Sequence, residues 1–164
     1  MNINMSINNE SKLTVNSFTI RTFIHSTESE EKVAMALKTL LPTEDLSIPP
    51  FKIQDLTGHF KNPLKSVSLK FTKQKEIKRI LNYLGFQIAP SSLKKIENSL
   101  SYRIEDKKSL FLRIDKQELS QGYIKFNDSG DVQVIIHIIN KNPRADTTIE
   151  GIKEYLTKEG LFQR

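Results

Sequence analysis

Apolar and polar residues alternate along several short stretches of the chain, a pattern typical of half-buried β-strands. In residues 15–24, VNSFTIRTFI, apolar side chains recur at every second position and Arg21 and Phe23 fall on the opposite side. Residues 65–71, KSVSLKF, alternate in the same way, and residues 51–56, FKIQDL, form a shorter candidate. The sequence therefore predicts three strands in its first half.

Other segments carry apolar residues at the 3.6-residue spacing of amphipathic helices. Thr27 and Glu30 have the spacing of a capping box at the start of the first of these segments, and Pro42 ends it. Gly85 is the expected stop of the second. Helices are predicted at residues 27–41, 73–85, 91–100 and 147–160.

Two polar tips between apolar runs predict β-hairpins. One tip is residues 106–108, and the other is residues 127–131, NDSGD, where Gly130 is able to adopt a positive φ. Strands that follow one another through short turns favour antiparallel pairing. We therefore expect an α+β fold, a mostly antiparallel mixed sheet with helices packed over one face.

The length of 164 residues is that of one ordinary domain. Residues 1–11 are rich in Asn and Ser and are expected to form a disordered arm, so residues 12–164 are predicted to make a single domain. No run approaches the roughly 18 to 20 apolar residues of a membrane span. The chain starts without a secretory signal and has no cysteine, which predicts a cytoplasmic location and no membrane partner.

Positive charge is concentrated in the middle of the chain. Residues 51–116 hold 15 Lys and Arg against 6 Asp and Glu, whereas both flanking segments are slightly acidic. A one-sided field of this kind attracts polyanions. Nucleic acid is the leading class of partner, and a solvated lysine-rich surface is the competing interpretation.

Motifs for catalysis are missing from the sequence. It has no Cys nucleophile, Gly-x-Ser-x-Gly elbow, phosphate-binding loop or dinucleotide-binding glycine pattern, and its three histidines are far apart. Asp115 follows an apolar strand, but capping the next helical turn explains its position. We expect no enzymatic activity, no metal and no other cofactor. A metal-assisted nuclease using His59 and Asp115 is the remaining catalytic hypothesis.

The loop GHFKNPL, residues 58–64, offers charge for phosphates, an amide for base edges and rings for stacking. The turn at residues 106–108 presents further lysines, and basic residues flank Asp115. Arg103 is expected on the strand piece that precedes this turn, and if the two strand pieces around the turn pair, these side chains share one face. The RNA-contact candidates from these segments are His59, Lys61, Asn62, Lys65, Arg103, Lys107, Lys108, Arg113 and Lys116.

Three motifs in order, FTIRTFIHSTESEEKV, GHFKNPL and LFLRIDKQELSQG, make the chain resemble the archaeal RNA-binding-domain family of predicted exosome subunits. The motif positions matched here are Arg21, His25, Thr27, Glu28, Gly58, His59, Asn62, Pro63, Arg113, Asp115, Lys116, Gln117 and Gly122. Gln117 joins the RNA-contact candidates through this resemblance. Ser26 stands where the family usually has Ala, and Lys61 where it usually has Gly.

The resemblance implies a fold similar to the large-subunit ribosomal protein that binds 5S rRNA, and a non-catalytic role in RNA processing or degradation. Its implied partners are RNA and exosome proteins. The alternative is a protein-interaction adaptor or a homodimeric structural domain that does not bind RNA directly. RNA binding through lysines predicts an affinity that falls as salt rises.

Overall fold

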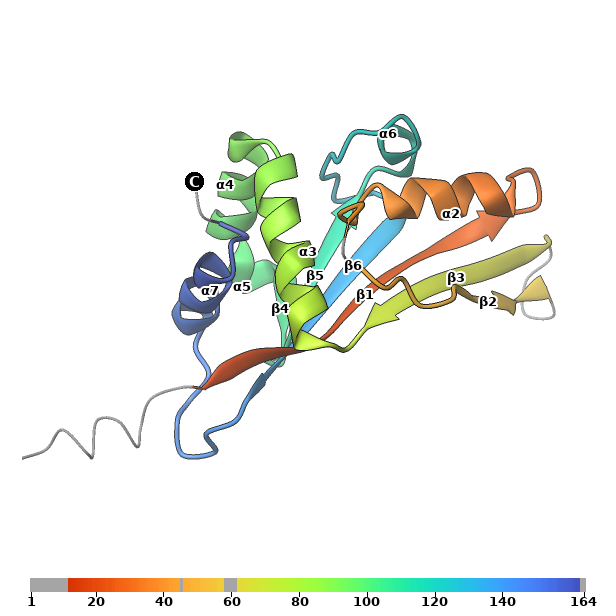
Figure 1. The fold of residues 1–164 in the computed structure, drawn as a ribbon. Helices are drawn as coiled ribbons and strands as arrows, with labels where there is room; N and C mark the ends of the chain where they lie inside the picture. The colour runs from red at the N-terminus through yellow and green to blue at the C-terminus, as the bar shows by residue number, and fades with distance from the viewer. Residues whose placement is uncertain (1–11, 45, 58–61, 163–164) are drawn as a thin grey trace, which may run out of the picture.

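A computed structural model describes residues 12–44, 46–57 and 62–162, and the predicted arm at residues 1–11 lies outside these ranges. Six strands form one open sheet in the order β2-β3-β1-β6-β5-β4, and every pairing is antiparallel (Figure 1). The strands are β1 (Leu13–His25), β2 (Lys52–Asp55), β3 (Leu64–Phe71), β4 (Ile104–Glu105), β5 (Ser109–Ile114) and β6 (Val132–Asn140). The prediction of an α+β fold is confirmed.

All described helices lie on the same side of the sheet (Figure 1), so the predicted one-sided cover is confirmed. They are α2 (Glu30–Lys38), α3 (Gln74–Gln87), α4 (Pro90–Asn98), α5 (Leu100–Arg103), α6 (Lys116–Ser120) and α7 (Ile149–Lys158). Within the described part of the chain, no helix combines the length and apolar character needed to cross a bilayer. The opposite side of the sheet, called here the open face, carries none of the described helices.

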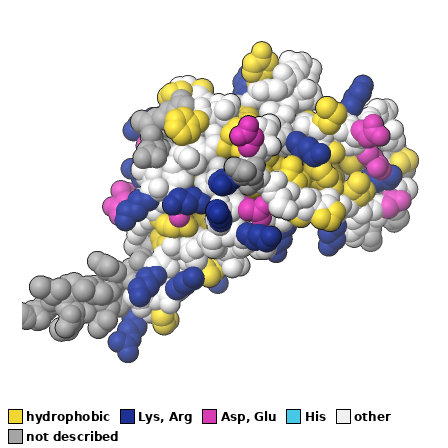
Figure 2. All heavy atoms as spheres, viewed as in Figure 1, with side chains coloured by type: hydrophobic (Ala, Val, Ile, Leu, Met, Phe, Trp, Pro, Cys, Tyr) yellow, Lys and Arg dark blue, Asp and Glu magenta, His cyan; other side chains and the backbone are white. Residues whose placement is uncertain are grey.

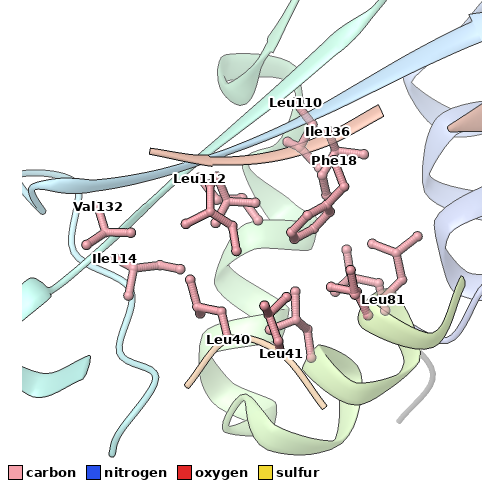
Figure 3. Close-up of a cluster of buried hydrophobic side chains, with 14 of the residues drawn as sticks. Phe18, Leu40, Leu41, Leu81, Leu110, Leu112, Ile114, Val132 and Ile136 are labelled. Atoms are coloured by element: carbon pink, nitrogen blue, oxygen red, sulfur yellow. The ribbon is translucent and has the colours of Figure 1, made fainter. Parts of the chain in front are cut away.

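The core lies between the sheet and the helices. Strand alternation points Phe18, Leu112 and Ile136 towards Leu41 and Leu81, and all five are at most 2% exposed (Figure 3). Because successive strand residues point to opposite sides, the residues between the buried ones lie on the open face. The buried stripe on each strand thus determines which side chains are displayed on the other side.

A β-bulge interrupts β1 between Val15 and Ser17. The backbone N–H of Val15 donates to the hydroxyl oxygen of Tyr155 (3.0 Å), and Gln74 Nε2 donates to the Val15 carbonyl oxygen (2.6 Å). A bulge removes ladder partners from the backbone, so buried polar groups there need other partners. Side chains of α3 and α7 supply them and tie both helices to the central strand.

Several predicted helix boundaries differ from the structure, and those at Thr27 and Gly85 differ for identifiable reasons. Ser29, and not Thr27, caps α2, because the Ser29 hydroxyl oxygen accepts a hydrogen bond from the Lys32 backbone N–H (3.4 Å). Glu28 instead turns back and accepts from the His25 backbone N–H (2.9 Å). Helix α3 continues past Gly85 to Gln87. Gly85 lies against the backbone of Gly160, and a Cβ at position 85 would stand 1.9 Å from the Gly160 carbonyl oxygen. This glycine serves close packing and not helix termination.

The predicted hairpin around residues 127–131 is also wrong. Phe126 forms an isolated bridge with Ile114, while β6 pairs with β1 and β5. Gly130 does not adopt a positive φ. Its Cα hydrogen faces the Ile114 carbonyl, where a Cβ would approach the oxygen to 2.4 Å. A tertiary contact therefore accounts for the glycine that the sequence assigned to a turn.

Candidate nucleic-acid interface

Five side chains form a row across the open face from β2 to β5. Cross-strand pairing places Lys52 opposite Ser68, Ser68 opposite Arg21, Arg21 opposite Gln133, and Gln133 opposite Arg113. Directly opposite residues project to the same side of a sheet. Neighbouring strands are about 4.8 Å apart, so this basic row extends over about 19 Å.

Hydrogen bonds orient the two arginines of the basic row. Arg21 donates through Nε to Gln133 Oε1 (2.6 Å), and Arg113 donates through a terminal nitrogen to the carbonyl oxygen of Gly130 (3.1 Å). In the described ranges, none of Arg21, Lys52 and Arg113 has a carboxylate oxygen within 4.0 Å. Their charges are therefore available to an external anion.

A hollow of about 560 Å³ lies over the basic row. Besides the five row residues, its lining includes Thr19, Thr22, Phe23, Gln54, Ser66, Val67 and Asp131. Phe23 is 46% exposed, because it sits on the open-face side of β1 with no helix above it. Lys70 is exposed on the same face, opposite Thr19. The hollow combines cations, amides and one aromatic ring.

The side of the molecule seen in Figure 2 has a different distribution of charge. Lys and Arg side chains there are interspersed with Asp and Glu. Ion pairs such as Lys78 with Glu159 (3.9 Å) and Lys94 with Glu97 (3.3 Å) occur on the helices. Such mixed surfaces give weaker fields than clusters of one sign.

The first and third sequence motifs meet at one end of the sheet. Lys116 donates to Glu28 Oε1 (2.8 Å) and to the carbonyl oxygen of Phe23 (2.6 Å), and its side chain is only 12% exposed. Burial alone would raise the pKa of Glu28, but hydrogen bonds from the His25 N–H and from Lys116 outweigh it and the pKa is lowered. Lys116 thus holds α6 against β1.

Asp115 caps α6, as predicted. Its Oδ1 accepts from the Glu118 backbone N–H (3.0 Å), and its Oδ2 accepts from Asn127 Nδ2 (3.3 Å). The hydrogen bond from Glu118 is the main cause of the lowered pKa of Asp115. Gln117, in the first turn of α6, is exposed.

The GHFKNPL loop joins β2 and β3, as expected, but His59 and Lys61 lie outside the described residues. Asn62 is exposed. Lys65 forms an ion pair with Glu30 (2.6 Å), and its pKa is raised by the hydrogen bond to that carboxylate. The RNA contacts predicted for this loop stay predictions.

The prediction that Arg103 lies on a strand is wrong. Arg103 is the last residue of α5, and the helical segment leads directly into the short β4. The Arg103 side chain pairs with Asp128 (3.0 Å). Lys107 and Lys108 are exposed at the β4–β5 turn. From position 108 to Arg113 the strand covers about 17 Å, at about 3.4 Å per residue. The structure therefore does not gather the predicted cations into one patch.

Arg113 is the RNA-contact candidate from the sequence that the structure places in the basic row. Sequence reasoning assigned Arg21 to the polar face of its strand but did not join it with Lys52 or Gln133. Strand alternation predicts the face of each residue, whereas the pairing register decides which residues meet across the sheet. The signal in the sequence that could have pointed to these open-face residues was the alternation of apolar and polar side chains in residues 15–24 and 65–71.

Comparison with known proteins identifies the family of this chain and several relatives. The model of the RNA_binding family, described as RNA binding, matches residues 17–141, which include most of β1 and all of β2 to β6. This chain belongs to the RNA_binding family. It is 29% identical over 153 residues to the RNA-binding protein PAB1135 of Pyrococcus abyssi, covering 90% of this chain and 97% of that protein. An uncharacterized protein of Methanocaldococcus jannaschii, MJ0213, is 28% identical over 121 residues, covering 72% of this chain and 80% of that protein.

Solved structures share the fold of this RNA_binding family member. Protein AF2318 from Archaeglobus fulgidus superposes with a TM-score of 0.73 at 25% identity, covering 89% of this chain and 99% of that one. Protein SSO0741 from Sulfolobus solfataricus gives a TM-score of 0.68 at 22% identity, covering 91% and 100%. Both carry the family label DUF54. The domain thus corresponds to nearly the whole length of each of these chains.

Proposed function

We propose that this member of the RNA_binding family is a non-catalytic, cytoplasmic RNA-binding module whose basic row contacts backbone phosphates. The observation that carries the proposal is the set of cations without carboxylate partners, within the described residues, on a sheet face that no helix covers. Arg and Lys supply most of the sequence-independent affinity for nucleic acid, because they displace condensed counterions.

The test is a titration of labelled RNA by fluorescence anisotropy across a salt series. The variant Arg21→Gln, Lys52→Gln, Lys70→Gln removes three cations from the open face. Each lost phosphate contact lowers the salt slope by about 0.7 for single strands, so the expected reduction is about 2. An affinity that does not change with salt would refute phosphate binding.

A matched control removes the same charge from the helix layer. Lys75, Lys95 and Lys158 are exposed on α3, α4 and α7 and have no ion pair among the described residues. The variant Lys75→Gln, Lys95→Gln, Lys158→Gln should keep the salt slope near that of the unaltered protein. If both triple variants lose the same slope, then net charge and not the position of the cations on the open face determines affinity.

The proposal also covers the absence of catalysis and the cellular role. RNA incubated with the protein should stay intact with and without added divalent metal; cleavage would favour the nuclease hypothesis with Asp115. On the strength of the sequence resemblance, we place the module in RNA processing or degradation with exosome proteins and in a fold related to the 5S-rRNA-binding ribosomal protein. Failure of purified exosome subunits to retain the protein would remove that association.

A second candidate is a homodimer or protein adaptor, which the exposed edge strand β2 favours. All four of its residues are exposed, and the Ile53 side chain is 46% accessible. An edge strand presents unpaired backbone groups to which another chain can add a strand. Light scattering should then show a concentration-dependent dimer, and Ile53→Ser, which removes the exposed apolar side chain without adding charge, should weaken it. A monomer at every concentration would exclude the homodimer.

A further inference from the structure

Phe23 occupies a position on the open face that phosphate binding alone does not explain. It lies two residues from Arg21 on the same side of β1, about 7 Å along the strand. Its cross-strand neighbour is Ser66, which in turn pairs with Gln54. The ring is therefore part of the hollow over the basic row and is flanked by short polar side chains.

Two amides share the hollow with the ring. Gln133 uses Oε1 to accept from Arg21, so its Nε2 donors remain for another partner. Gln54 is exposed, and its side chain has no hydrogen bond in the described part of the chain. Glutamine side chains can both donate to and accept from a base edge. The hollow thus offers a surface for a base plane and groups for a base edge.

Duplex RNA cannot use this combination, because its bases are stacked on each other and its deep major groove is closed to side chains. An unpaired nucleotide exposes both its ring face and its edge. We propose that the hollow accepts an unpaired base of single-stranded RNA, stacked on Phe23 and contacted along its edge by Gln54 and Gln133, with the adjoining phosphate on Arg21. This inference rests on the proposed RNA-binding function and specifies its substrate class.

The chain contains no Trp, so Phe23→Trp introduces a single indole that reports stacking directly. Single-stranded RNA of about 12 nucleotides, within the about 4–16 nucleotide site sizes of single-strand binders, should quench its fluorescence. The blunt duplex of the same sequence should not. Tyr102→Trp is the control, because Tyr102 is 90% exposed on α5 in the helix layer and its indole should respond to neither RNA.

Binding measurements on side-chain variants complete the test. Phe23→Leu keeps an apolar side chain without the aromatic plane, and we expect it to lose about tenfold in affinity for single-stranded RNA, consistent with the stacking free energy per base. Phe23→Tyr should retain the affinity, and the salt slope should be unchanged in both. Urea unfolding of each variant confirms that the fold persists.

Three results would overturn the inference. These are duplex RNA binding as tightly as single-stranded RNA, Phe23→Leu binding like the unaltered protein, and quenching of the indole at position 102 equal to that at position 23. The first two leave phosphate binding by the basic row intact. Absence of salt-dependent binding to either RNA would instead refute the proposed function together with this inference.

Discussion

Replacing Gly85 by alanine tests whether residues 160–162 pack directly against helix α3. Gly85 lies inside α3, two residues before its end, and is buried. Helix propensity alone predicts that Gly85→Ala stabilises the protein by about 0.8–1.0 kcal/mol. The tertiary structure predicts the opposite sign, because the space for the new methyl group is already occupied.

The size of the effect follows from three contacts. The added Cβ would stand 1.9 Å from the Gly160 carbonyl oxygen, 3.0 Å from its carbonyl carbon and 3.1 Å from the carbonyl oxygen of Leu161. All three atoms are backbone, so relief requires moving residues 160–162, whose Leu161 and Phe162 side chains are buried. Overpacking a core typically lowers the free energy of unfolding by about 1–3 kcal/mol. Because the clashing atoms here are backbone, we expect a cost at the upper end, about 3 kcal/mol. After the propensity gain of about 1 kcal/mol, we expect a net loss of about 2 kcal/mol.

Urea unfolding followed by far-ultraviolet circular dichroism measures this difference. The midpoint concentration should fall with an unchanged m-value, since the exposed area on unfolding stays the same. Gln87→Ala, at an exposed position of the same helix, is the control and should stay within about 0.5 kcal/mol of the unaltered protein. A Gly85→Ala protein that is equally or more stable would show that the close approach of α3 and residue 160 is not a feature of the folded state.

Three other predictions concern stability. Tyr155→Phe removes the oxygen that accepts from the buried Val15 N–H at the bulge and should cost about 1–3 kcal/mol; a urea midpoint unchanged from the parent would contradict this. The folded-state pKa of Glu28 lies below its ordinary 4.5, so its stabilising effect is complete above about pH 4.5 and is lost as the pH falls through the folded pKa. The stability difference between Glu28→Gln and the parent should therefore shrink in acid, and a constant difference from pH 7 to pH 3 would refute it. Lys107 has a φ of 55°, so Lys107→Gly should raise the free energy of unfolding by about 0.5–1 kcal/mol, while Lys108→Gly, at an ordinary φ, should lower it.

The sequence by itself determined the elements whose signal is local. Alternation in residues 15–24 and 65–71 gave two adjacent strands of the sheet and the face of each side chain, and the apolar spacing gave the main helices. It also placed Arg21 and Phe23 on the side of β1 away from the core. These properties depend only on backbone geometry and on the burial of apolar side chains, which neighbouring residues encode.

Only the tertiary structure decided which distant residues meet. Arg21 lies beside Gln133 because β1 pairs with β6, and the basic row exists because four pairings share one register. Long-range contacts also explain two glycines that the sequence assigned to a helix stop and a turn. Gly85 and Gly130 lie against backbone atoms of segments that are distant in the sequence. Long-range register and close backbone approach depend on the partner segment as much as on the residue itself, so a single stretch of sequence does not encode them.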